Sequence, residues 1–101
     1  MAWYFLGNVS IPSGQNLYDG VVAAYAAMPA GTTPGVPDPV PNMVNEIVFG
    51  GTSSIAVLDP VGNTVTLPVP SLSGGGRNTI DLRTFKFSGA VSGLQVAFSV
   101  I

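Results

Sequence analysis

Cysteine and histidine are both absent from the 101 residues. Without cysteine the chain has neither a disulfide nor a thiolate nucleophile. Without histidine it lacks the commonest general base and the preferred transition-metal ligand. Five carboxylates remain, but no motif pairs two of them as a glycosidase would require; they are Asp19, Asp38, Glu46, Asp59 and Asp81. We therefore expect a protein that is not an enzyme and that binds neither a cofactor nor a metal.

Charge is also scarce. Charged residues make up 8% of the chain, against about 25% in a typical soluble domain. Three cations against five acids give a net charge of -2, which is too small to drive binding to nucleic acid or to an anionic membrane. Because few charges oppose self-association, and the mean hydropathy is +0.48, we expect a homo-oligomer or burial in a larger assembly.

Long apolar runs are missing as well. No stretch approaches the ~18 residues that a membrane span needs, and residues 1–10 lack the basic segment and long apolar run of a signal peptide. The expectation is a protein made and kept in a cytoplasm, or packed into a particle assembled there. At this length the chain is one domain, residues 1–101.

The patterns that are present are mostly those of β-strands. Residues 2–11 alternate with period two, which predicts a strand with Trp3, Phe5, Val9 and Ile11 on one face and either a bulge or a close backbone contact at Gly7. Further strands are predicted at 45–50, 53–59, 64–70, 79–89 and 94–101, separated by Gly, Pro and Asn turns. Leu94, Val96, Phe98 and Val100 share one face of the last. The fold class is therefore all-β, an antiparallel β-sandwich or small jelly-roll-like barrel.

Two segments depart from this pattern. Residues 17–28 carry apolar side chains at helical spacing after Asn16, a possible cap, and so predict the one short helix, although Gly20 disfavours it and a strand is the rival. Residues 29–42 hold five of the nine prolines. Proline excludes a helix or central strand there, leaving either a flexible loop or an extended arm that is ordered on a neighbour.

Residues 73–89, "SGGGRNTIDLRTFKFSG", contain all three cations, Arg77, Arg83 and Lys86. A phosphate-binding loop would need a Lys-Ser/Thr pair and a following helix, and neither is present. The stretch is better interpreted as a turn, with residues 71–78 a loop, followed by a strand. Ile80 and Leu82 share one parity and Phe85 and Phe87 the other, so the strand is buried on both faces or shifts phase near Arg83–Thr84.

Residues 78–101, with the glycine-rich turns, the low charge and the lack of Cys and His, resemble the small β-rich virion proteins of tailed bacteriophages, and capsid decoration (cement) proteins above all. The resemblance implies a homo-oligomer, often a trimer, that stabilises a phage head by contacts with the major capsid protein. It offers no catalytic residues. Under this hypothesis the contact surface draws on the first strand and the proline-rich segment, through Trp3, Tyr4, Phe5, Pro29, Pro34, Pro37, Pro39 and Pro41.

Two alternatives stay open. A tail, fibre or other accessory subunit of the virion would have the same sequence character. A carbohydrate-binding β-sandwich would use exposed aromatic rings, for which Trp3, Tyr4, Tyr18 and Tyr25 are available.

Overall fold

The computed structural model describes residues 2–29, 39–69 and 71–101. All paired strands are antiparallel, and the described part of the chain has one α-helix and one short 3-10 helix, so the expected all-β fold with one short helix is confirmed. In chain order the elements are β1 (Ala2–Ile11), α1 (Leu17–Ala26), β2 (Met43–Val44), β3 (Glu46–Gly50), β4 (Ser54–Leu58), β5 (Thr64–Pro68), β6 (Ser71–Ser73), β7 (Ile80–Asp81), η1 (Leu82–Thr84) and β8 (Val91–Val100).

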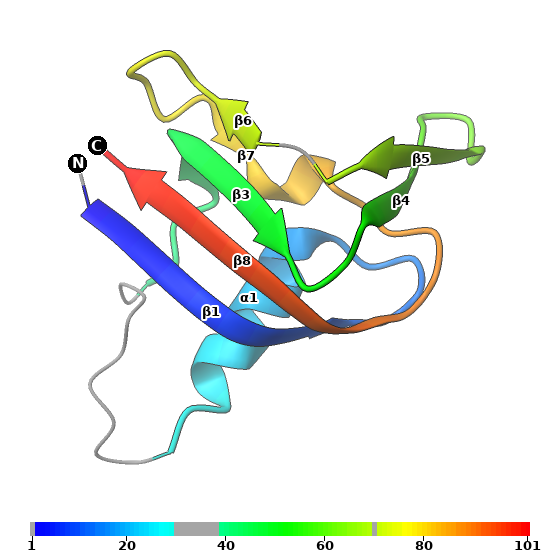
Figure 1. Ribbon diagram of the computed structural model, residues 1–101, viewed down its shortest axis with the longest axis horizontal. Helices are drawn as coiled ribbons and strands as arrows, with labels where there is room; N and C mark the ends of the chain where they lie inside the picture. Colours follow the sequence, from blue (N-terminus) through cyan, green and yellow to red (C-terminus); the bar gives the residue numbers. More distant parts are fainter. Residues whose placement is uncertain (1, 30–38, 70) are drawn as a thin grey trace.

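The main layer is a four-stranded sheet in the order β1-β8-β3-β6 (Figure 1). Its two long strands, β1 and β8, come from opposite ends of the chain and pair along most of their length. As predicted, β8 turns one set of alternating side chains into the core, where Leu94, Val96 and Phe98 are buried. The hydrophobic core lies against this side of the sheet.

The first strand changes phase in its middle. The sequence pattern placed Trp3 and Phe5 on the same face as Val9, and this is wrong. The register with β8 shifts between Leu6 and Val9, and the side chains of Leu6 and Val9 are both buried in the core. Trp3 and Phe5 therefore point to the face of the sheet away from the core. An extra residue in a strand reverses the alternation beyond it. The bulge was expected at Gly7, but its consequence for the preceding residues was not.

The predicted helix is confirmed, with its last two residues outside it. Asn16 is the N-cap, and its side-chain oxygen accepts a hydrogen bond of 2.9 Å from the Asp19 amide. This cap satisfies one of the amide groups that a helix start leaves without a partner. In Figure 1 the helix lies behind β1 and β8. No helix in residues 2–29, 39–69 and 71–101 combines the length and apolar character that a membrane crossing needs.

Gly20, which disfavours the helix by propensity, is where the helix touches the sheet. A Cβ at this position would lie 2.5 Å from Cγ1 of Ile11 and 3.2 Å from Cγ1 of Val9. The glycine is thus selected by close packing, because any larger side chain would push the helix off β1. Leu17 and Val21 on the same helical face are fully buried.

A smaller layer closes the core. The β4–β5 hairpin is joined to residues 85–88 by hydrogen bonds such as Leu58 N–H to the Lys86 carbonyl, 2.7 Å. The same segment is bonded on its other side to the start of the helix, where the Leu17 amide donates to the Phe85 carbonyl at 2.8 Å. Phe87, at the centre of this layer, has no exposed surface.

The strand expected over residues 79–89 is broken into parts. β7 is two residues long, and η1 follows it at once. Asp81 caps η1, accepting a hydrogen bond of 2.9 Å from the Arg83 amide. The change of parity between Leu82 and Phe87 had indicated a phase shift near Arg83–Thr84, and η1 produces it. The side chains of Leu82 and Phe87 are both fully buried as a result.

Candidate docking surface on the main sheet

The main sheet has a second face, turned away from α1 and the core, which we call the outer face. Cross-strand partners share a face, so the pairing of β1, β8 and β3 fixes which side chains lie next to one another there. Two rows cross the sheet, Trp3–Ser99–Glu46 and Phe5–Ala97–Val48, and Gln95 and Gly50 follow.

Large apolar side chains are exposed on this face. Phe5 is 70% exposed, Trp3 39% and Val48 37%. The rings of Trp3 and Phe5 stack at 18° with their centroids 6.4 Å apart. They form a continuous aromatic wall along β1, and Val48 stands on β3 opposite it. Two of these side chains lie on β1 and the third on β3, on the far side of β8, and together they form a patch, whereas single exposed apolar residues would need no explanation.

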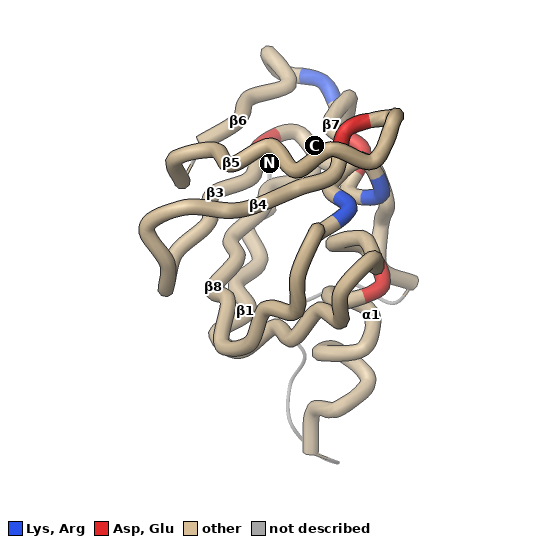
Figure 2. The backbone as a smooth tube through the Cα atoms, turned by 90° about the vertical axis from the view of Figure 1, so that its right-hand side faces the viewer, with Lys and Arg blue, Asp and Glu red and all other residues tan. Residues whose placement is uncertain are grey.

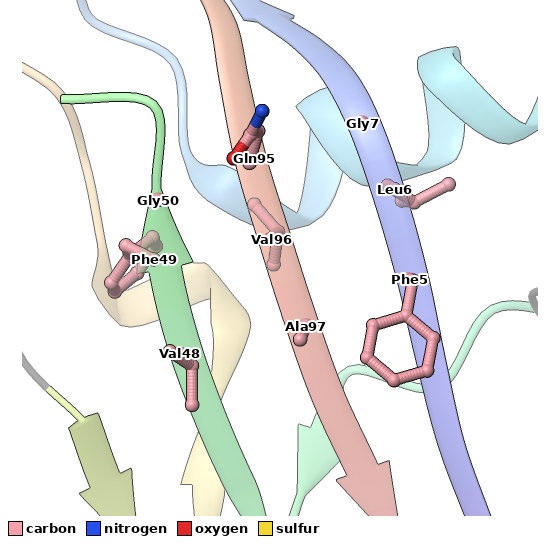
Figure 3. A pocket seen from close by; sticks show the side chains of 9 residues that line it. All are labelled: Phe5, Leu6, Gly7, Val48, Phe49, Gly50, Gln95, Val96 and Ala97. Carbon is pink, nitrogen blue, oxygen red and sulfur yellow. The ribbon is translucent and has the colours of Figure 1, made fainter.

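Between Phe5 and Val48 lies a shallow groove of about 310 Å³. Ala97 is its floor, because its short side chain sits between the larger Phe5 and Val48 (Figure 3). Gln95 lies farther along β8 and adds a polar group to the lining. The alternation of a small residue on β8 with large ones on both neighbours is what hollows the sheet here.

Charge is kept away from this groove. β1 and β8 contain no charged residue, and in Figure 2 the coloured segments lie on α1, around β7 and in turns, with one acidic segment on β3, which begins at Glu46. Glu46 is the charged side chain in the two rows, and it lies one row away from Val48. The outer face is therefore suited to apolar contact with a partner and not to electrostatic attraction.

The predicted interface residues separate into groups. Trp3 and Phe5 lie on the outer face, but Tyr4 points to the core side, where its ring packs on Phe98 with a centroid distance of 5.7 Å. Val48 and Ala97 were not singled out. They sit in short apolar runs, "IVF" and "VAF", whose outward residue is not identifiable without the register.

Three of the predicted interface prolines, Pro29, Pro39 and Pro41, lie in the described part of the chain. Pro29 is exposed and lines a hollow beside Leu6 and Asn8, at the end of α1. Pro39 is exposed and Pro41 is half-buried. Pro34 and Pro37, and with them most of the expected proline-rich arm, lie outside the described residues.

Two of the carboxylates in the described ranges, Asp59 and Asp81, have local partners. Asp59 accepts hydrogen bonds from the amides of Asn63, 2.8 Å, and Val61, 3.0 Å, and these bonds, that of Asn63 foremost, hold its pKa below the usual value. Asp81 is paired with Arg83 at 2.8 Å, and the hydrogen bond from that side chain lowers its pKa likewise. These groups organise turns.

The glycine-rich turn is held from inside the molecule. The Gly74 amide donates to the carbonyl of the buried Asn45, and the Gly76 amide donates to the Asn45 side-chain oxygen at 3.0 Å. Amides bonded in this way do not form a free anion cradle. The loop expected at residues 71–78 is partly wrong, because Ser71–Ser73 form β6 and pair with β3.

No three His, Cys, Asp or Glu side chains of the described segments gather closely enough to hold a metal ion. Comparison of the chain with models of protein families finds no match. Neither the curated proteins nor the solved structures contain a match. The geometry of the outer face is therefore the basis of the functional argument.

Proposed function

We propose that this protein is a non-enzymatic structural subunit that docks on another protein through the outer face of its main sheet. The observation that carries the proposal is the groove between the exposed side chains of Phe5 and Val48, with the Trp3 ring stacked on Phe5 beside it. It is apolar, uncharged and built on paired strands, so its shape is fixed before a partner arrives. A preformed surface loses little conformational entropy on binding.

The partner we propose is the shell of a bacteriophage head, with the protein as a decoration or cement subunit that contacts the major capsid protein. This part rests on the resemblance of residues 78–101 and of the overall composition to small virion proteins. The character of the outer face agrees with a capsid role, because a subunit that strengthens a protein shell needs an apolar contact surface and no reactive groups.

The test is co-sedimentation of the purified protein with capsids that lack it. We expect saturable binding by the wild type and a loss of at least tenfold in affinity for Val48→Ser, which removes one wall of the groove. Val61→Ser is the matched control, since Val61 is 81% exposed and lies at the β4–β5 turn, away from the groove. Equal binding by both variants would refute the docking surface, and no binding by the wild type would refute the capsid role.

The carbohydrate-binding alternative keeps one observation in its favour, the stacked and exposed pair of Trp3 and Phe5. The other aromatic candidates are turned inward. Tyr18 donates its hydroxyl to the Val40 carbonyl at 3.1 Å, and Tyr25 packs against the core. A strong saturable signal on a glycan array that Trp3→Ala abolishes, together with no binding to capsids, would favour this function instead.

A further inference from the structure

The main sheet and the β4–β5 hairpin leave three strand edges to compare. Exposed edges invite pairing with another chain, and proteins limit this with short strands, charges or prolines. β6 is three residues long, and β5 carries Pro68. β1 has ten residues with neither a charge nor a proline, and no strand in the described part of the chain pairs with its other side. Among the described residues it is the edge that none of these devices protects.

The bonding groups on this edge can be identified. The Ser99 carbonyl accepts a hydrogen bond of 2.8 Å from the Asn45 amide, so the backbone groups of Ser99 point toward β3. Ser99 lies opposite Trp3 of β1. Because the backbone groups of Ser99 point to β3, Ser99 and Trp3 form a non-hydrogen-bonded pair, in which the groups of Trp3 point away from β8. Residues on successive positions of a strand direct these groups to opposite sides. Trp3, and Phe5 two positions later, therefore turn their N–H and C=O groups to the open edge.

We propose that a second copy of this chain pairs with this edge, β1 against β1, antiparallel about a two-fold axis at Tyr4. The regular part of the strand is Ala2–Leu6, because the bulge begins after Leu6 and the end of α1 flanks the strand there. Only a two-fold axis at Tyr4, the central residue, allows the whole of this regular part to pair with the same part of the second copy. Trp3 of each copy then lies opposite Phe5 of the other, and the two pairs exchange about four backbone hydrogen bonds.

Three features of the strand favour a second copy over a different partner. The edge groups of Trp3 and Phe5 match each other under the two-fold rotation, as a symmetric interface requires. No charge on β1 would face its own copy. Each Trp3 ring gains the Phe5 ring of the second copy as a cross-strand neighbour, which continues the aromatic wall across the axis.

This pairing goes beyond the proposed docking function and uses different groups. It uses the main chain at the sheet edge, whereas docking uses side chains on the outer face. The product is a continuous eight-stranded sheet with two grooves on one side. A two-fold contact also differs from the trimer that the resemblance to decoration proteins implies.

Cross-linking tests the register. The chain has no cysteine, so Trp3→Cys and Phe5→Cys each introduce one thiol. Opposite residues in a hydrogen-bonded pair have Cα atoms about 5.5 Å apart, within disulfide range, whereas diagonal neighbours lie at about 7–8 Å, beyond it. We expect a mixture of the two variants to give a disulfide-linked dimer and either alone to give little. A mixture that links no better than the separate variants would overturn the proposal.

A second test removes one edge donor. Phe5→Pro and Phe5→Ala both lose the ring, but only proline also loses the edge-facing amide, a change that edge strands tolerate. In sedimentation equilibrium at about 100 µM we expect dimers for the wild type and Phe5→Ala and at least a tenfold weaker dimer for Phe5→Pro. Equal dimerisation of both variants would contradict edge pairing, and if Phe5→Pro does not fold, the cross-linking result decides. Val48→Ser should stay dimeric, so loss of docking and loss of pairing are distinguishable.

Discussion

Gly20→Ala tests the packing that positions β1, because two effects of known size oppose each other. Alanine favours a helix interior over glycine by about 1 kcal/mol, so propensity alone predicts stabilisation. The new Cβ would lie 2.5 Å from Cγ1 of Ile11, whereas ordinary contacts lie at 3.4–4 Å. The helix and strand would have to separate by about 1 Å, and overpacking of this kind costs about 1–3 kcal/mol.

We therefore expect Gly20→Ala to lower the free energy of unfolding by about 1 kcal/mol, which corresponds to a fall in Tm of about 4–8 °C for a domain of this size. Urea titration followed by circular dichroism measures it. Ala23→Gly, at an exposed position of the same helix, is the matched control for propensity and should cost about 1 kcal/mol.

A double-mutant cycle isolates the contact. Ile11→Ala alone should cost about 2–5 kcal/mol, because Ile11 is fully buried. In that background the closest contact is removed and Cγ1 of Val9, at 3.2 Å, is the tightest that remains, so Gly20→Ala should become neutral or stabilising, a change that reports coupling between the two positions. If Gly20→Ala raises stability in the wild-type background, the proposed crossing of α1 over β1 is wrong.

Three further predictions concern stability. Asn16→Ala removes the N-cap and should cost about 1 kcal/mol, with Asn16→Asp near neutral, in urea titrations. Phe87→Ala should cost about 3–5 kcal/mol and Phe5→Ala less than about 0.5, because the first ring is fully buried and the second is exposed. The hydrogen bond from Arg83 holds the pKa of Asp81 below its ordinary value of 3.8. The ionised carboxylate therefore stabilises the fold at pH values above 3.8, and this contribution is lost as the pH falls through the lowered pKa. Asp81→Asn should thus be less stable than the wild type at neutral pH, with a gap that closes in acid. A gap of constant size would contradict the pairing.

Much of the fold followed from local patterns. The alternation in β3, β4 and β8 predicted these strands near their observed positions, because each turns buried side chains to the core, and β5 was predicted although only Leu67 of this strand is partly buried. The helix followed from its apolar spacing and its asparagine cap. The sequence of a segment is enough to predict its helix or strand when its buried residues recur with the period of that helix or strand.

The rest depended on contacts between distant residues. Gly7 indicated a bulge, but only pairing with β8 shows that Leu6 is buried and Phe5 exposed. β6 has three residues and becomes a strand by pairing with β3. The groove needs Phe5, Ala97 and Val48 side by side, from three strands of remote sequence position. No periodicity within one segment contains that information.

Carbene footprinting of the protein mixed with capsids measures docking through the outer face directly. Mass spectrometry reads the labelling of this chain alone, whatever the composition of the shell. We expect the labelling of Val48 to fall severalfold on binding, while that of Val61, on the β4–β5 turn, is unchanged. Val48 lies two strands away from the open edge of β1, so its protection does not arise from pairing of two copies. Equal labelling of Val48 in the free and bound protein, or protection of Val61 in its place, would contradict the account.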